Sequence, residues 1–185
     1  MKSFSTGFPA PMTERRRFLA ALALLALPLS ARAQQRAALS PVPGVPPAPT
    51  LALPDMDDKL VDLARYRGKV VLVNFWATWC PPCRKEFPSL GRVRKLFKPA
   101  DFEVLAVNVG EDPETAFSFA GAVDFPILFD RDSKAMARWQ VRGLPSTFVV
   151  DRQGRLALRA VGGREFDEPA IVGQLRELLG KGRTS

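Results

Sequence analysis

The sequence predicts an α/β fold with three layers, in which helices cover both faces of a mixed central sheet. The run Val70–Trp76 is almost continuously apolar, as expected for a strand that is buried on both faces, and Phe102–Val109 is the next predicted strand. A basic, helix-prone segment separates them, so the three elements form a strand–helix–strand unit. The C-terminal part has the pattern of an antiparallel hairpin followed by an amphipathic helix, which makes the sheet a mixed one.

The first 33 residues have the pattern of a cleaved export signal. Arg15–Arg17 precede the apolar run Phe18–Leu29, and Ala31-Arg32-Ala33 is a small-x-small cleavage site. Because the apolar run is short for a bilayer span, we expect cleavage near Ala33 and a periplasmic protein; a retained membrane anchor is the alternative. The order Arg-Arg-x-Phe-Leu resembles a twin-arginine signal, and the general secretory route stays open.

Residues 34–49 are rich in proline and alanine and predict an extended, partly disordered linker. The globular domain is therefore expected over residues 50–185. A domain of this size forms a hydrophobic core without disulfide staples.

The first half of the domain contains four predicted elements. A short hairpin is expected over 51–61, and Asp62 is suited to cap a brief helical turn that ends near Arg67. Gly68 separates this turn from the predicted strand Val70–Trp76. The next helix is expected from Cys80 to about Phe97, with a kink at Pro88.

The second half follows the strand Phe102–Val109 with shorter elements. Turn residues and apolar runs delimit each of them. They are a helix over 113–122, a strand over 126–129, a short helix over 133–140, the hairpin 146–150 with 155–161, and the helix 166–179.

The charge of the chain gives no reason to expect a nucleic-acid partner. Residues 1–33 hold five basic and one acidic residue, so the remaining part carries 22 basic and 18 acidic residues and a mild net charge of +4. Six of the basic residues lie between Arg84 and Lys98, where Glu86 is the one acid. We interpret this run as a solvated helix face; the alternative is a positive rim that attracts an acidic partner or an anionic membrane.

Cys80 and Cys83 are the only cysteines, and their spacing predicts thiol–disulfide exchange. In the first turn of a helix, two such residues lie within disulfide reach, and the helix N-terminus favours the thiolate of the first. Cys80 is thus the expected nucleophile and Cys83 the resolving thiol. A metal site is the competing interpretation, but two thiolates are half of a tetrahedral set and the chain has no histidine.

Glu86 is predicted to carry a carboxyl group on the apolar stripe of this helix, close to the sulfur atoms. Helical rotation places it on the same side as Cys83, Phe87 and Leu90. Burial there would raise its pKa and let it exchange protons near neutral pH. A glutamate that extends to solvent is the alternative.

The sequence Trp79-Cys80-Pro81-Pro82-Cys83 after an apolar strand, the segment Gly143–Thr147 and the element order resemble the thioredoxin superfamily. More narrowly they resemble the exported TlpA/ResA-like thiol–disulfide oxidoreductases, over roughly residues 50–180. The resemblance implies a thioredoxin-like fold with an N-terminal hairpin and a central α/β insertion. It also implies an active-site glutamate at Glu86, while Asn74 stands where many thioredoxins place a buried aspartate.

The resemblance further implies a cis peptide bond at Pro145, opposite the cysteines, where the backbone pairs with an extended substrate segment. Leu144, Pro145, Pro81, Pro82 and Trp79 are the expected substrate-binding residues. Trp79 offers an apolar contact for a partner, whereas Trp76 is expected to pack in the core and Trp139 in the central insertion.

The function implied by the resemblance is that of a periplasmic reductant of protein disulfides, in cytochrome c maturation or in cuproprotein or oxidase assembly. A membrane-bound electron donor is then a second partner, and we expect a monomer that needs neither a cofactor nor a metal. The chain departs from some cytochrome c maturation members in one respect, because Ser146 stands where they carry an acid.

Two other functions use the same cysteines. A peroxiredoxin-like peroxidase shares the fold, but Ala77 occupies the position where its threonine is normally found. A copper-binding metallochaperone needs further soft ligands, and Met56 and Met136 are the methionines outside the signal.

Overall fold

The computed structural model describes residues 38–181 apart from residue 122. The predicted export signal lies outside these residues, as does the beginning of the predicted linker. Among the described helices, none is long and apolar enough to cross a membrane.

The core of the domain is a six-stranded mixed sheet in the order β1-β8-β7-β4-β5-β6. The central strand β4 pairs in parallel with β5 and antiparallel with β7, and β5 pairs in parallel with β6. The strands are β1 (Ser40–Pro41), β4 (Val70–Trp76), β5 (Phe102–Val109), β6 (Ile127–Asp130), β7 (Ser146–Val150) and β8 (Leu156–Val161). A separate two-stranded hairpin consists of β2 (Ala52–Pro54) and β3 (Leu60–Asp62).

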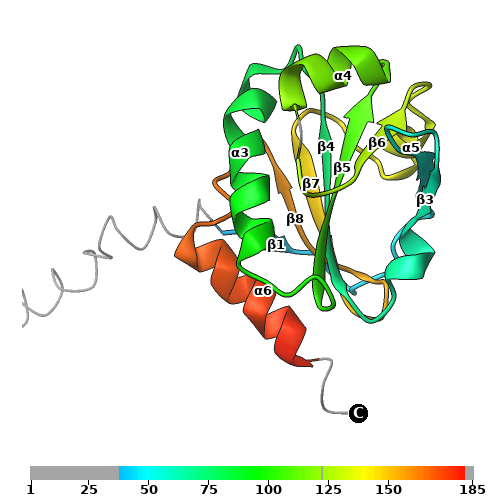
Figure 1. Ribbon diagram of the computed structural model, residues 1–185. Coiled ribbons are helices and arrows are strands. Elements are labelled where there is room, and N and C mark those ends of the chain that lie inside the picture. The colour runs from blue at the N-terminus through cyan, green and yellow to red at the C-terminus, as the bar shows by residue number, and fades with distance from the viewer. Residues whose placement is uncertain (1–37, 122, 182–185) are drawn as a thin grey trace, which may run out of the picture. The chain divides into compact units, whose positions relative to one another are not determined.

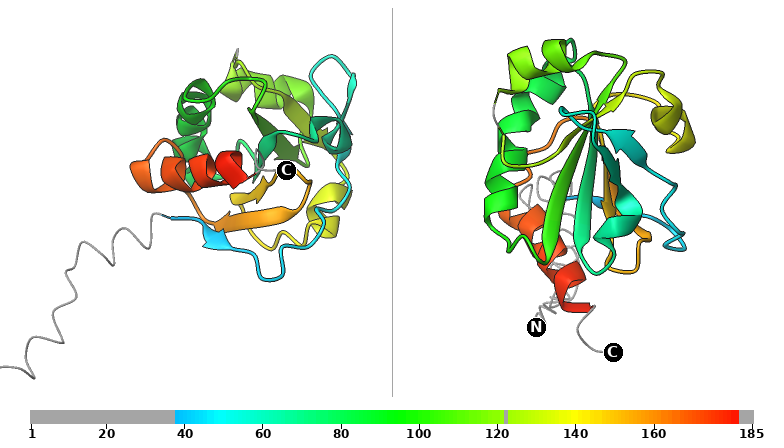
Figure 2. Two further views of the ribbon diagram at one scale, coloured as in Figure 1. Left: turned by 90° about the horizontal axis from the view of Figure 1, so that it is seen from below. Right: turned by 45° about the vertical axis from the view of Figure 1, so that its right-hand side comes forward.

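Helices cover both faces of this sheet, as predicted. Helices α3 (Pro81–Lys95) and α6 (Pro169–Lys181) lie on one side, while α5 (Lys134–Arg138) and the β2–β3 hairpin lie on the other (Figures 1 and 2). Alternate residues of β4 enter two different clusters, so that Leu72 faces the core under α3 and Val73 faces the core that contains Leu51 and Trp139. The three-layer α/β/α architecture follows from this two-sided burial.

Most predicted elements are present near their predicted bounds. The strands β4, β5 and β7 occupy the predicted residues, and Asp62 accepts a hydrogen bond from the N–H of Ala64 to cap the 3-10 helix Leu63–Tyr66. Helix α4 (Pro113–Ala120) begins at Pro113, as predicted from the preference of proline for the first turn of a helix. Helix α6 begins three residues later than predicted, because the chain around the buried Phe166 still belongs to the preceding turn.

The expectation of a partly disordered spacer is wrong for the described part of residues 34–49. Leu39 is buried, its N–H donates to Gln174 on α6, and Ser40 and Pro41 pair with β8. Pro47 forms a further bridge to Arg155. A proline lacks an N–H, and this excludes it from central strands but not from the edge of a sheet, so this segment covers the edge of β8.

Candidate functional site

The two cysteines form a disulfide at the start of α3. Cys80 is the residue that caps the helix, Cys83 lies one turn inside, and their Cα atoms are 5.3 Å apart. The exposed fraction is 4 % for Cys80 and 0 % for Cys83, so the order of exposure is the predicted one although both residues are largely buried. A partner's sulfur can therefore reach Cys80 more easily than Cys83.

The helix start directs one backbone donor at the Cys80 sulfur. Pro81 and Pro82 occupy the first helical positions and have no N–H, so Cys83 supplies the first free N–H of the helix. That N–H donates to the Cys80 Sγ over 3.3 Å. A donor at a helix N-terminus stabilises negative charge, and this arrangement favours a thiolate on Cys80 once the disulfide is reduced.

A carboxylate fixes the loop that precedes the motif. Glu111, just after β5, accepts hydrogen bonds from the backbone N–H of Thr78 over 2.8 Å and from the Asn108 side-chain amide over 2.6 Å. The Thr78 hydroxyl also donates to Glu111. No local sequence pattern singled out Glu111 as a functional residue. It could have been found from topology, because the carboxyl ends of the parallel strands β4 and β5 lie at one edge of the sheet.

Glu86 lies inside the protein, which excludes the solvent-exposed alternative. It is 2 % exposed; its Oε1 accepts from the Asn74 amide over 2.7 Å and its Oε2 accepts from the Arg164 backbone N–H over 2.9 Å. Burial raises the pKa of Glu86 to about 7, and the hydrogen bonds from Asn74 and Arg164 oppose this shift in part. A carboxyl group with this pKa can take or give a proton at neutral pH.

Ser89 continues the contact between α3 and the chain after β8. Its hydroxyl donates to the Glu86 carbonyl over 2.6 Å and accepts from the buried N–H of Phe166 over 3.0 Å. Together with Glu86 it joins α3 to residues 162–167. The contact links positions more than 70 residues apart, and no local sequence signal predicted it.

The same segment lies between the cis-proline and the cysteine motif. The Leu144–Pro145 peptide bond is cis, as the resemblance implied, and the Pro145 carbonyl accepts from the N–H of Gly162. A Cβ atom on the next residue, Gly163, would lie 3.4 Å from the Pro82 carbonyl oxygen. The loop after β8 thus contacts both Pro145 and Pro82.

The predicted substrate-binding residues differ in exposure. Trp79 is 68 % exposed, and Pro81 and Pro82 are also exposed, whereas Leu144 is half-buried against the core and Pro145 is buried. Trp76 and Trp139 are buried, as predicted for packing residues. The large exposed apolar side chain beside the disulfide is therefore that of Trp79.

The methionines do not assemble a site for a soft metal. Met56 packs against the core under α3, and Met136 packs against the core on the other face of the sheet. Within the described residues there is no group of three or more Cys, His, Asp and Glu side chains that could hold a metal ion.

Comparison with known proteins gives consistent relatives. The Redoxin family matches residues 44–175. The thiol-disulfide oxidoreductase ResA of Bacillus subtilis is 35 % identical over 140 residues, which cover 75 % of this chain and 76 % of the relative. A homologue of the same name from Bacillus cereus is 31 % identical over 71 % of this chain and 76 % of its own length.

Solved structures give the same result. A crystal structure described as a putative thiol:disulfide interchange protein DsbE from Chlorobium tepidum has 35 % identity and a TM-score of 0.67, over 73 % of this chain and 96 % of its own. The exposed lipoprotein thioredoxin Etrx1 of Streptococcus pneumoniae has 31 % identity and a TM-score of 0.59, over 69 % of this chain and 98 % of its own.

Proposed function

This chain belongs to the Redoxin family and is a ResA-like thiol–disulfide oxidoreductase of the thioredoxin superfamily, and on this premise we propose that it reduces protein disulfides in the periplasm. The observation that carries the proposal is the Cys80–Cys83 pair at the start of α3, one turn before a buried Glu86 whose pKa is about 7. A dithiol, a helix N-terminus and a nearby proton acceptor are the groups that thiol–disulfide exchange requires.

The reaction starts from the reduced protein. The Cys80 thiolate attacks one sulfur of the partner's disulfide, forms a mixed disulfide and releases the partner's other sulfur as a thiolate, which takes a proton. Cys83 then loses its proton and attacks the Cys80 sulfur, which releases the second partner thiolate. Two electrons have passed to the partner, and Cys80 and Cys83 are joined as in this structure.

We propose that Glu86 accepts the proton that the Cys83 thiol loses when it attacks Cys80. The two residues lie one helical turn apart on the buried side of α3, so water has little access to the Cys83 thiol. A carboxylate with a pKa of about 7 is half ionised at neutral pH and can accept that proton during the attack and later release it. Glu86→Gln should slow the resolving step and change its pH profile; an identical profile in both proteins would remove this role.

The proposed contact surface for the partner consists of Trp79, Pro81, Pro82, Leu144 and Pro145. The exposure of Trp79 beside the disulfide and the cis peptide bond at Pro145 support this assignment. Aromatic side chains with large exposed area are common anchors of protein interfaces.

The proposed setting is cytochrome c maturation or the assembly of a cuproprotein or oxidase. A reductant in an oxidising compartment must be reduced again, so a membrane-bound electron donor is the second partner, and the proposed working form is a monomer. The export pattern of residues 1–33 supports a periplasmic location, as does the likeness to an exposed lipoprotein thioredoxin. Residues 1–33 are proposed as the signal and residues 50–185 as the thioredoxin-like domain, to which the described part of 34–49 adds an edge strand.

Trapping of the mixed disulfide tests the proposal. The reduced Cys83→Ser variant should accumulate a covalent complex with a disulfide-bearing protein such as native insulin, because the resolving thiol is missing. The Cys80→Ser variant is the control and should trap nothing. Equal trapping by both variants, or trapping by neither, would contradict the assignment of Cys80 as the nucleophile.

The direction of electron flow and the peroxidase alternative need separate measurements. At equal concentrations of reduced and oxidised glutathione, a reductant should be found mainly in its disulfide form, whereas an oxidant should be found mainly as the dithiol. Rapid consumption of hydrogen peroxide by the reduced protein would favour the peroxidase. Ala77 and the pairing of Cys80 with Cys83 do not favour it.

A further inference from the structure

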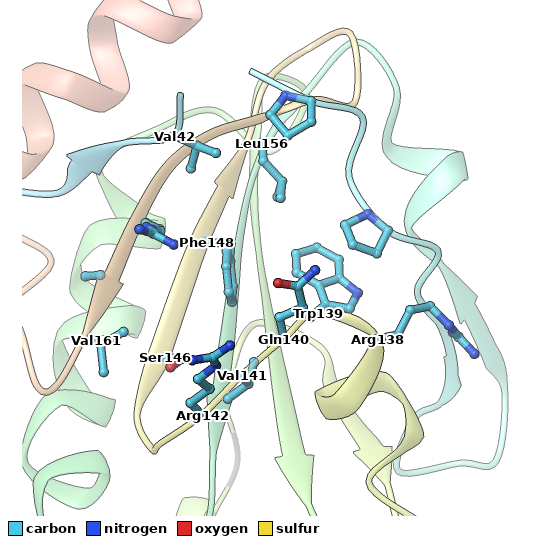
Figure 3. A pocket seen from close by; sticks show the side chains of 14 residues that line it. Val42, Arg138, Trp139, Gln140, Val141, Arg142, Ser146, Phe148, Leu156 and Val161 are labelled. Atoms are coloured by element: carbon cyan, nitrogen blue, oxygen red, sulfur yellow. The ribbon is translucent and has the colours of Figure 1, made fainter. Parts of the chain in front are cut away.

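A recess lies on the face of the sheet opposite α3. It has a volume of about 430 Å³ and is formed by β7, β8, the chain that follows α5 and the segment before β2. Figure 3 shows Arg142, Ser146 and Val161 together near one end of the recess, and Val42 and Leu156 near the other. A volume of this size is in the range of ligand-binding pockets.

The recess combines an apolar floor with a positive rim. Trp139 and Phe148 pack edge to face in its floor, with ring centroids 5.3 Å apart. Arg138, Arg142 and Arg159 line it and are exposed, and no Asp or Glu is among its lining residues. Aromatic rings with neighbouring guanidinium groups are the side chains most enriched where proteins bind proteins.

The positive charge of this rim is not compensated within the described part of the chain. None of these three arginines forms an ion pair with a described carboxylate. Arg94, Arg152 and Arg155, in contrast, are each paired with an acid. A surface that leaves its cations unpaired around an apolar floor attracts a partner with acidic and apolar side chains.

One end of the recess adjoins the proposed substrate contact. Ser146 lines the recess and directly follows the cis Pro145. Val161, which is 68 % exposed, pairs with Ser146 across β7 and β8, and the next residue, Gly162, donates to the Pro145 carbonyl. A polypeptide that passes Pro145 therefore needs only a few further residues to enter the recess.

We propose that this recess, lined by Arg138, Arg142 and Arg159 over Trp139 and Phe148, binds an acidic segment with apolar side chains next to the disulfide of the partner protein. The inference rests on the proposed function and adds a substrate class to it: partners whose disulfide is flanked by acidic and apolar residues. The continuity with Pro145 favours a segment of the partner over a free small anion.

Competing peptide disulfides test the proposal. Two synthetic peptides share one intramolecular disulfide ring and differ only in their flanks, which are Asp-Phe-Glu-Leu or Lys-Phe-Lys-Leu. The kcat/KM for each peptide is divided by the kcat/KM for hydroxyethyl disulfide. This reference substrate is too small to extend from the active-site disulfide into the recess. For the double variant Arg142→Gln/Arg159→Gln, we expect the preference for the acidic peptide to fall by about fivefold, as two exposed charge pairs imply.

Two matched variants serve as controls. Arg65→Gln/Arg176→Gln removes the same charge from exposed sites outside the recess and should keep the wild-type preference. Arg142→Lys/Arg159→Lys keeps the positive charge and should retain most of the preference for the acidic peptide. An equal loss in the Arg65→Gln/Arg176→Gln variant would overturn the proposal, because the preference would then follow net charge alone, and so would an unchanged preference in the Arg142→Gln/Arg159→Gln variant.

Titration with a cysteine-free peptide of the sequence Asp-Phe-Glu-Leu-Asp-Phe separates docking from catalysis. Binding that depends on Arg142 and Arg159 supports the recess even if no disulfide is reduced, in which case the proposed function fails and the docking site stands. Binding of 1-naphthoate without binding of the peptide would overturn the proposal in favour of a small anion. An arginine-dependent dimer in sedimentation would overturn it in favour of a second copy of this chain.

Discussion

The two ends of helix α3 each lie beside a nearly buried glutamate, but the two carboxylates have different partners. Near the start, Glu86 is 2 % exposed and accepts hydrogen bonds from the Asn74 amide and the Arg164 backbone, both uncharged donors. Near the end, Glu103 is 8 % exposed and lies 2.7 Å from the Arg94 guanidinium.

The difference separates a reactive acid from a structural one. A cation next to a buried carboxylate compensates its charge, so Glu103 and Arg94 act as a fixed connection between α3 and β5. Neutral donors compensate only part of the desolvation, and the pKa of Glu86 is therefore about 7. The chain places the partly compensated acid one turn from Cys83 and the ion-paired one at the far end of the helix.

The largest expected effect concerns the pH dependence of stability at Glu86. The pKa of Glu86 is about 7 in the folded protein against a reference value of 4.5, so the folded state binds more protons between these pH values. The free energy of unfolding should therefore fall by about 3 kcal/mol as the pH rises through this window, and the fall should be complete above pH 7. Chemical unfolding of the oxidised protein from pH 4 to pH 8 measures it.

Glu86→Gln should lack this fall, because a glutamine does not titrate. Glu177→Gln, at an exposed site on α6, is the matched control and should keep the wild-type slope. Parallel pH profiles for wild type and Glu86→Gln would mean that Glu86 does not hold its proton in the folded protein.

Loss of the cation at the other end should destabilise without affecting exchange. Arg94→Leu leaves Glu103 without its counter-charge, and because both side chains keep some exposure, 16 % and 11 %, we expect a loss of about 2 kcal/mol at pH 7. The rate of disulfide reduction should stay at the wild-type value. Arg94→Leu/Glu103→Leu should regain most of the stability, and a double variant no more stable than Arg94→Leu would refute the ion pair as the cause.

Sequence patterns were sufficient to predict the central sheet and the burial of Glu86, but not the partners of Glu86. The near-continuous apolar run of β4 predicted a strand buried on both faces, and helical periodicity placed Glu86 among the buried side chains of α3. The contacts of Glu86 and Ser89 with residues 164–166 could not be predicted, because they join segments more than 70 residues apart. The edge strand at Ser40–Pro41 was missed for a different reason, since proline-rich composition describes a backbone without showing what it packs against.

Ser89 holds the loop after β8 against the reactive end of α3, and its loss should have a moderate effect. Ser89→Ala removes the acceptor of the buried Phe166 N–H, and an unsatisfied buried donor costs about 1 kcal/mol. Thermal unfolding measures the loss. Ser118→Ala is the matched control on α4, where an exposed hydroxyl donates to the Glu114 carbonyl, and it should be less destabilising. A larger loss for Ser118→Ala would mean that the buried contact of Ser89 adds little.

Arg92 should contribute least, although it makes the most polar contacts with the same loop. Its guanidinium pairs with Glu165 and Asp167, but the side chain is 49 % exposed, and water and salt screen pairs of this kind. Arg92→Gln should therefore destabilise less than Ser89→Ala at low salt, and the difference from wild type should vanish in about 1 M sodium chloride. If Arg92→Gln proved the more harmful of the two at high salt, surface ion pairs rather than the buried contacts of Glu86 and Ser89 would hold residues 162–167 against the active-site helix.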